Sequence, residues 1–333
     1  MSRPINLTTV QWTDMPLPEL CGHAARWGYD GLTLACHPRH FDAGRARQDL
    51  DYVDEVAHLL RSHGLRVNAL AAHMLGQAVC DPVDDRHRNI LDDAVWGDGE
   101  PEGVRRRAAE AMAALPAAAA RLGADTVVGF TGSPVWHMFM LFPPVSQDDI
   151  QSGYQEFADR WHPILDAFDD ARVRFALEVH PTEIAYDYWT TARTLDALGH
   201  RPAFGLNLDP SHFLWQGLDP AVFAYDYRER LYHVDLKDAV LRTDGRAGRL
   251  GSHLPWADPR RGWDFVTVGH GDVDFEALIR TLNAIGYDGP LSVEWEDAGM
   301  DRLTAAPQAL SRVRELAAIS PADASFDASF GHR

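Results

Sequence analysis

Short apolar stretches rich in β-branched residues alternate along the chain with longer stretches in which apolar residues recur every three to four positions. The first such unit is a segment of helical spacing over residues 18–27, then Gly28, then a β-prone stretch over residues 29–35. Apolar residues at helical spacing predict an amphipathic helix, and a glycine directly after them marks its end. The order helix, glycine, strand returns several times, which predicts repeated βα units.

This pattern yields eight strands and predicts an α/β fold, a (β/α)8 TIM barrel. We expect strands at residues 5–12, 29–35, 65–73, 125–130, 175–180, 204–209, 231–238 and 290–297. We expect helices at residues 18–27, 50–63, 103–122, 154–168, 190–198, 220–230 and 275–285, with Pro116 kinking or interrupting the third. A doubly wound sheet usually carries a glycine-rich phosphate loop after its first strand, and residues 11–16 do not form one.

Two segments break the repeat. Residues 131–149 are aromatic and rich in Met and Pro, which predicts a loop insertion that acts as a lid or partner surface, or that simply packs over the barrel. Residues 239–270 predict an extended loop. We expect one TIM-barrel domain over residues 1–320, followed by a small, polar C-terminal tail over residues 321–333 that is disordered or loosely docked.

Composition and charge narrow the class of protein. The 333 residues are 46% hydrophobic and 24% charged, which is typical of a globular protein with a large core. A formal net charge of -18 repels polyanions, so nucleic acid is disfavoured as a partner. Cys21, Cys36 and Cys80 are spaced too irregularly for a disulfide framework or a zinc motif, which predicts reduced thiols in a cytoplasmic protein. No signal peptide and no membrane-spanning run are expected.

Acidic residues stand at the carboxyl ends of the last four predicted strands. They are Glu178, Asp209, Asp235 and Glu294. One acid at a strand end is more often a helix cap than a ligand, but four of them at one barrel rim predict a shared metal. A mostly carboxylate set favours Mn, with Mg, Co or Zn as alternatives.

Basic residues beside these acids leave several roles open. His233, Asp235 and Lys237 alternate and therefore face the same side of their strand. His233 is either an alternative metal ligand or a hydrogen-bonded core residue. Lys237 is either an auxiliary acid or an ion-pair partner. His212 follows Asp209 closely enough to reach either the metal or a sugar hydroxyl.

Carboxylates on two walls of one rim predict abstraction of a proton next to a carbonyl, in a sugar-like substrate. The candidate catalytic residues are Glu178 and Glu294 as the acid-base pair, with His180, His270 and Lys237 as auxiliary acids or electrostatic stabilisers. His270 lies in a glycine-flanked turn, which fits solvent exposure and catalysis equally. His73 ends the third predicted strand and is either structural or in contact with substrate. Isomerisation, epimerisation and β-elimination share this first step.

On these residues the chain resembles the xylose isomerase-like, sugar phosphate isomerase/epimerase superfamily, most strongly from Val173 to Asp297. Its members are TIM barrels that hold a metal with a Glu, an Asp followed three residues later by His, a His or Asp in an H-x-K-D-like strand, and a final Glu. The positions that resemble this set are Glu178, Asp209 with His212, Asp235, and Glu294. Many epimerase relatives carry His where this chain has Asp235, so His233 stays open as the ligand.

Four stretches resemble the large subunits of bacterial C-glycoside deglycosidases more closely. They are residues 157–166, 178–189, 251–263 and 292–301. This resemblance implies cleavage of the C–C bond between a 3-keto sugar and an aromatic aglycone, a manganese-type ion, a small β-rich partner subunit and a higher oligomer. It also implies that Trp136 and His137 contact the aglycone or the partner, and that Trp263 roofs the site.

Other functions remain as alternatives. A sugar (phosphate) isomerase or epimerase is the main one. An endonuclease IV-type nuclease would need further His ligands and a basic rim, and the net charge of -18 argues against it. A non-catalytic sugar-binding barrel is disfavoured because the acids at all four strand ends are intact. We expect a metal-dependent lyase or isomerase/epimerase that acts on a small-molecule keto sugar or glycoside.

Overall fold

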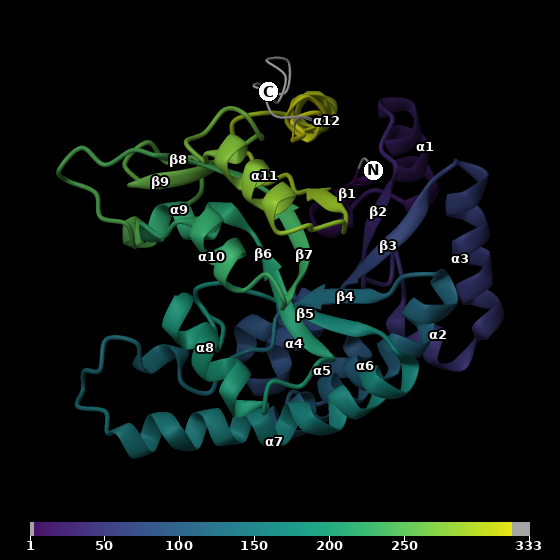
Figure 1. The fold of residues 1–333 in the computed structure, drawn as a ribbon. Coiled ribbons are helices and arrows are strands. Elements are labelled where there is room, and N and C mark those ends of the chain that lie inside the picture. Colours follow the sequence, from purple (N-terminus) through teal and green to yellow (C-terminus); the bar gives the residue numbers. More distant parts are fainter. Residues whose placement is uncertain (1–2, 322–333) are drawn as a thin grey trace, which may run out of the picture.

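Eight parallel strands close into a barrel in the computed structural model, which describes residues 3–321 (Figure 1). The strands are β1 (Ile5–Thr8), β2 (Gly31–Ala35), β3 (Arg66–Ala71), β4 (Thr126–Gly129), β5 (Arg174–Glu178), β6 (Phe204–Leu208), β7 (Leu231–Leu236) and β10 (Leu291–Val293). Their order around the barrel is β1-β10-β7-β6-β5-β4-β3-β2. The predicted (β/α)8 fold is therefore confirmed, and β10 ends before Glu294.

Helices surround the barrel and cover its outer face (Figure 1). They are α1 (Leu17–Trp27), α2 (Ala43–Gln48), α3 (Leu50–Ser62), α4 (His73–Cys80), α5 (Asp93–Trp96), α6 (Pro101–Leu122), α7 (Gln147–Ala171), α8 (Tyr188–Ala197), α9 (Pro210–Gln216), α10 (Pro220–Asp226), α11 (Phe275–Ala284) and α12 (Arg302–Ala317). Gly28 and Gly123 end α1 and α6 in the left-handed conformation that their lack of a Cβ allows. Pro116 does not interrupt α6, which continues through it, and the kink expected there as the alternative stays a prediction.

Further local predictions differ from the structure, and helices α2, α4, α5 and α12 were not predicted. The first strand stops at Thr8, and a 3-10 turn over Val10–Trp12 follows it. His73 does not end a strand but is the first residue of α4. Helix α9 was not predicted, although Asp209 caps it by accepting a hydrogen bond from Ser211 N and Pro210 occupies its first position. The Asp-Pro-Ser sequence was the available signal for this helix.

The two irregular segments contain structure of their own. In residues 131–149, a 3-10 turn spans Trp136–Met138, and α7 begins at Gln147 with Ser146 and Asp149 forming a capping box. In residues 239–270, β8 (Asp238–Leu241) and β9 (Trp263–Val266) pair as an antiparallel hairpin outside the barrel sheet. This hairpin follows β7 directly, so it stands beside the carboxyl ends of the barrel strands.

Three further predictions concern membrane spans, the cysteines and the C-terminal tail. Within residues 3–321, no helix combines the length and apolarity needed to cross a membrane. Cys21, Cys36 and Cys80 are buried free thiols, and burial raises the pKa of Cys21 to about 12. The predicted tail lies outside the described residues, except for its first residue.

Candidate active site at the carboxyl ends of the strands

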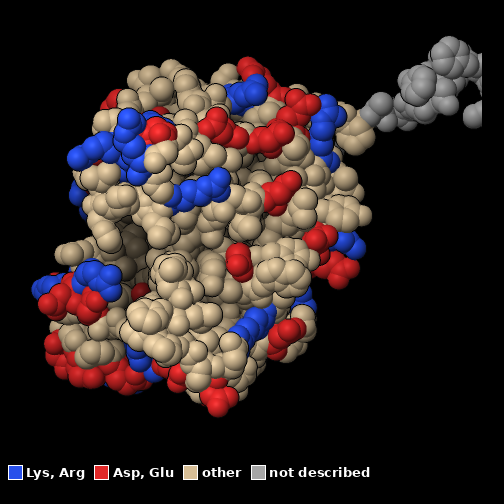
Figure 2. Space-filling model, turned by 90° about the vertical axis from the view of Figure 1, so that its left-hand side faces the viewer, with Lys and Arg blue, Asp and Glu red and all other residues tan. Residues whose placement is uncertain are grey.

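A cavity of about 470 Å³ opens at the carboxyl ends of the barrel strands. Its polar floor is formed by His73, Glu178, His212, Lys237 and Glu294. Its upper wall is aromatic and is formed by Phe130, Trp215, Trp256, Trp263 and Phe265. Figure 2 views the side of the molecule that carries the β8–β9 hairpin and shows a hollow there, flanked by wide stretches of uncharged surface. A polar floor under an aromatic wall suits a ligand with one polar and one apolar part.

Glu178 ends β5 and lies between two imidazoles. Its Oε2 is 2.9 Å from His73 Nε2, and its Oε1 is 3.2 Å from His212 Nε2. Burial alone would raise the pKa of Glu178, but the contacts with His212 and His73 and the charge of Lys237 lower it well below its usual value. Glu178 is therefore a fully ionised carboxylate in a buried position.

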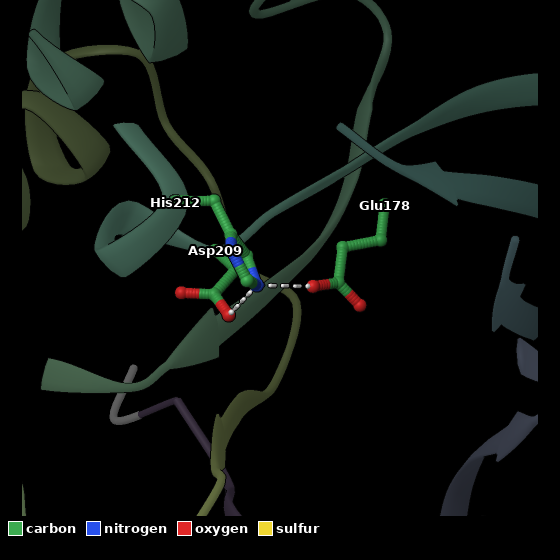
Figure 3. A group of neighbouring side chains, drawn as sticks. All are labelled: Glu178, Asp209 and His212. Carbon is green, nitrogen blue, oxygen red and sulfur yellow. Dashed lines mark ion pairs between the residues drawn. The ribbon is translucent and has the colours of Figure 1, made fainter. Parts of the chain in front are cut away.

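Asp209 shares His212 with Glu178. Its Oδ2 lies 3.2 Å from His212 Nε2, so the imidazole stands between the two carboxylates (Figure 3). Its Oδ1 accepts hydrogen bonds from Ser211 N and Oγ, which fixes the carboxylate at the start of α9. The helix cap fixes the position of Asp209. Because the cap uses only Oδ1, Oδ2 remains free for a second partner.

Glu294 lies just beyond β10 and has different neighbours. Gln11 Nε2 donates hydrogen bonds to Glu294 Oε1 and to Glu296 Oε1, and Lys237 Nζ is 3.2 Å from Glu294 Oε2. Burial raises the pKa of Glu294 well above its usual value; Lys237 opposes this rise, and Glu296 adds to it. The Glu294 carboxyl therefore holds its proton more tightly than the Glu178 carboxyl does.

Gln11 and Glu296 were not among the residues predicted from the sequence. Glu296 stands two residues after Glu294, and this alternation was a usable signal for a second acid on the same face. Gln11 gave no signal, because it lies in a 3-10 turn and its partner Glu294 is 283 residues away in sequence.

Three side chains could hold a divalent cation. Glu178, Asp209 and His212 each offer a ligand atom within 4.8 Å of the others, and all three are buried. Divalent ions bind such atoms at about 2.0–2.6 Å, so atoms up to about 5 Å apart can share one ion. Within residues 3–321, Asp209 Oδ2 and His212 Nε2 make no hydrogen bond of normal geometry, although charged neighbours surround them. Buried ligand atoms without a hydrogen bond fit a cation.

Asp235 and His233, the two residues expected in the third ligand position, lie deeper in the barrel. Asp235 accepts hydrogen bonds from Asn207 Nδ2 (2.6 Å) and Thr8 Oγ1 (3.4 Å), and His233 Nε2 is hydrogen-bonded with Ser292 Oγ (2.8 Å). Neither residue lines the cavity. The structure therefore does not bring them to the group formed by Glu178, Asp209 and His212, and their ligand role stays a prediction.

Replacing Asp235 by asparagine tests that role. Because Asp235 already has protein partners, we expect D235N to keep one bound Mn²⁺ per chain, with less than about a threefold change in affinity. Metal analysis and calorimetry on the stripped and reloaded protein measure this. Loss of the bound ion in D235N would support the ligand role expected from the sequence.

The remaining predicted site residues fall into two groups. His180 and Trp263 line the cavity, and the His180 ring lies 4.1 Å from the His212 ring. Trp136, His137 and His270 do not line it. His270 is exposed in a turn whose glycine N–H groups donate to Asp238.

Trp136 instead lines a second cavity of about 280 Å³, together with Phe139, Tyr186 and Glu183. The Glu183 carboxylate is buried and accepts hydrogen bonds from Thr131 N and Gly132 N, both at 2.7 Å. These contacts hold the start of the segment that follows β4. Burial, with the charge of Asp81, raises the pKa of Glu183 to about 8.

Glu183 should make stability depend on pH. Its folded pKa exceeds the usual 4.5, so the folded protein binds this proton more tightly than the unfolded chain does. The resulting stabilisation is full below about pH 4.5 and is lost as pH rises to about 8, a loss of roughly 5 kcal/mol. Thermal unfolding of wild type and E183Q between pH 5 and 9 should show a smaller decline for E183Q. Parallel profiles would contradict the assignment.

Comparison with known proteins agrees with this architecture. The model of a family described as xylose isomerase-like TIM barrels matches residues 21–316. The chain belongs to this family. The chain is also 28% identical over 308 residues to the uncharacterized protein YfiH of Bacillus subtilis, covering 89% of this chain and 91% of YfiH.

Two further similarities are more limited. The inosose dehydratase of Clostridium tetani is 32% identical over 113 residues, which are 33% of this chain and 37% of that protein. The structure of 3-keto-D-glucoside 4-epimerase YcjR from E. coli superposes with a TM-score of 0.65 at 16% identity, covering 94% of this chain and 99% of that one. At this identity the second likeness concerns the fold alone.

Proposed function

We propose that the protein is a divalent-metal-dependent enzyme that removes a proton next to a carbonyl in a keto sugar. The observation that carries this proposal is the group of Glu178, Asp209 and His212, of which Glu178 and His212 line the open cavity and Asp209 is buried in contact with His212. When bound, a divalent cation would polarise a carbonyl or hydroxyl oxygen of the substrate and so acidify the hydrogen on the neighbouring carbon. Family membership and the partial similarity to inosose dehydratase support a sugar-like substrate.

The two glutamates are suited to opposite proton-transfer roles. Glu178 and Glu294 come from strands separated by β6 and β7, so they face the cavity from different walls. His212 and His73 lower the pKa of Glu178, which favours its ionised form, and burial raises the pKa of Glu294, which favours its protonated form. Environments that separate two carboxyl pKa values favour one acid and one base. Glu178 would accept a proton, and Glu294 would return one.

Neighbouring side chains would orient these groups. Gln11 holds the Glu294 carboxyl through its amide, and His212 lies on the cavity floor between Glu178 and Asp209. Lys237 is buried and its pKa is well above the usual value; burial opposes this rise, and Asp209 and Glu294 cause it. Its fixed positive charge would stabilise negative charge on a substrate oxygen.

Deuterium exchange tests this function directly. The metal-loaded protein is incubated in D₂O with free ketoses, 3-keto-O-glucosides or 3-keto-C-glycosides, and NMR follows both exchange at the carbon next to the carbonyl and product formation. We expect exchange with at least one class, and product identity then separates isomerisation, epimerisation, elimination and C–C cleavage. Absence of exchange in every class would contradict the proposal.

C-glycoside cleavage is the more specific candidate, and the aromatic wall favours it. Trp215 and Trp263 stack at 4.8 Å, and Trp256 and Phe265 pack 5.1 Å apart above the acidic floor. A free hexose offers such a wall only the C–H face of one ring, whereas an aromatic aglycone adds a second ring that stacks on it. A sugar isomerase or epimerase remains the alternative, and a nuclease is disfavoured by the net charge of -18.

Replacement of Trp256 separates these candidates. Trp256 is 52% exposed, so W256A removes a cavity wall at little cost to the core. We expect kcat/KM to fall about tenfold for aryl-bearing keto sugars, and to stay within about twofold for free ketoses. Steady-state kinetics with both substrates measure the difference. Equal losses for the two substrates would contradict a role in aglycone binding.

The deglycosidase candidate also includes a small partner subunit. Met140, Phe142 and Trp189 are 67%, 80% and 76% exposed, and large exposed apolar side chains are typical of protein contacts. These residues lie on the segment after β4 and at the start of α8, close to the second cavity. We propose this surface as the contact for such a subunit. Co-expression of a candidate subunit with wild type and with W189D would test it, and equal recovery of the complex in both cases would contradict it.

A further inference from the structure

Lys237 is the only lysine among the 333 residues of the chain. It follows β7 directly and is 3% exposed at the floor of the cavity. Its Nζ lies 2.9 Å from Asp209 Oδ2, 3.2 Å from Glu294 Oε2 and 3.6 Å from Glu296 Oε1. Apart from the histidines, every other basic side chain in the sequence is an arginine. Position 237 therefore carries a compact ammonium group where the rest of the chain carries guanidinium groups.

The ammonium and the metal group share one oxygen. Asp209 Oδ2 is both the atom closest to Lys237 Nζ and the atom that lies 3.2 Å from His212 Nε2. A divalent cation held by Asp209 and His212 would therefore stand within a few ångströms of the ammonium. Two positive charges this close repel strongly when solvent is excluded, and Asp209 is fully buried. Asp209 Oδ2 therefore cannot pair closely with the Lys237 ammonium and with a divalent cation at the same time.

Lys237 has a second position open to it. Glu294 and Glu296 both line the cavity, and both are already near the ammonium. The four-carbon stem of lysine allows Nζ to leave Asp209 and stay with these two carboxyl groups. The Phe265 ring, whose centroid is 4.8 Å from Nζ, would flank this movement.

We propose that Lys237 is an internal competitor of the metal. In the metal-free protein its ammonium neutralises Asp209, and cation binding displaces it toward Glu294 and Glu296. This inference rests on the proposed function only in that the group of Glu178, Asp209 and His212 must bind a divalent cation. Lys237 then lowers the metal affinity of the site and stabilises the metal-free fold.

Calorimetric titration with Mn²⁺ tests the competition. The metal-stripped full-length protein is compared with K237M, which keeps the length of the side chain and removes its charge. We expect K237M to bind Mn²⁺ about tenfold or more tightly than wild type, because no charge has to be displaced. R280M is the matched control, because Arg280 forms an exposed pair with Glu276 on α11, away from the site. Its Mn²⁺ affinity should equal that of wild type.

Thermal unfolding of the same proteins gives a second readout. In chelator, K237M should unfold about 5 °C or more below wild type, because it leaves buried carboxylates without their counter-charge. With saturating Mn²⁺ this difference should fall to less than half. An undiminished difference would mean that Lys237 pairs with Asp209 in both states, and would overturn the proposal.

The single lysine allows a test on the wild-type chain, even if K237M does not fold. Protein labelled with ¹³Cε-lysine should give one lysine signal, and titration with diamagnetic Zn²⁺ should move it until the site is saturated. A signal that stays in place at saturation, or equal Mn²⁺ affinities for wild type and K237M, would overturn the competition alone. Absence of metal binding in every protein would overturn the proposed function and this inference with it.

Discussion

Replacement of Glu178 by glutamine is expected to lower proton exchange on a keto sugar by about 10³-fold. The amide keeps the shape of the side chain but removes the negative charge that lies 2.9 Å from His73 and 3.2 Å from His212. E178Q should also lose most of its bound Mn²⁺, because one of three candidate ligand atoms becomes a weak donor. Deuterium exchange by NMR and metal analysis of the dialysed protein measure both effects.

E276Q is the matched control for this substitution. Glu276 lies on α11 and forms an exposed ion pair with Arg280, so the same chemical change there should leave exchange and metal content unaltered. E178Q that retained both its bound Mn²⁺ and more than a tenth of the exchange rate would remove Glu178 from the proposed site. Unfolding curves of both variants would separate this result from a loss of fold.

Replacement of Asp209 by asparagine is expected to destabilise the metal-free protein by about 3 kcal/mol. The amide oxygen introduced by D209N can still accept the hydrogen bonds from Ser211 that cap α9, so the cap is retained. The charge that faces Lys237 at 2.9 Å and His212 at 3.2 Å is lost, and the ammonium remains buried with fewer counter-charges. Chemical denaturation in chelator measures the loss, and calorimetry should show much weaker Mn²⁺ binding.

D219N provides the comparison for D209N. Asp219 caps α10 in the same way, through hydrogen bonds from Ala221 N and Val222 N, but it is remote from the cavity floor. We expect D219N to cost less than about 1 kcal/mol. The double variant D209N/K237M should recover part of the D209N loss, because it removes the unpaired ammonium as well. Equal losses of unfolding free energy in D209N and D219N would contradict a stabilising pairing of the Asp209 charge with Lys237.

The barrel could be predicted from the sequence because both of its signals are local. Apolar stretches of strand length and glycines after helical segments recur within each unit, and neither depends on distant residues. Glu178 and Asp209 could be predicted to lie at the same rim, because all parallel strands in a barrel end on the same side. Lys237 and Glu294 follow from that rule too.

The depth of each side chain could not be predicted in this way. Alternation places His233, Asp235 and Lys237 on one side of β7, but only Lys237 lines the cavity. Asp235 accepts a hydrogen bond from Asn207 instead. Which layer of the barrel a residue occupies depends on the stagger between strands. The structure sets it through shifts of register such as the one between Leu206 and Asn207.

The β8–β9 hairpin was hidden for another reason. Residues 242–262, which join its two strands, are rich in Gly, Pro and Arg and follow no period, so the whole segment looked like a loop. Gln11 was hidden by distance, since its contact with Glu294 exists only after the barrel has closed. Contacts of this kind leave no trace in local sequence patterns.

The hairpin that supplies Trp263 and Phe265 forms its ladder only with itself, as a two-stranded sheet apart from the barrel. Its sequence can therefore diverge without breaking any inter-strand bond of the eight-stranded frame. The polar floor is thus separable from the part of the aromatic wall that the hairpin supplies (Trp256, Trp263 and Phe265), and grafting residues 239–266 onto a related barrel should transfer part of the ligand preference while the host keeps its own chemistry.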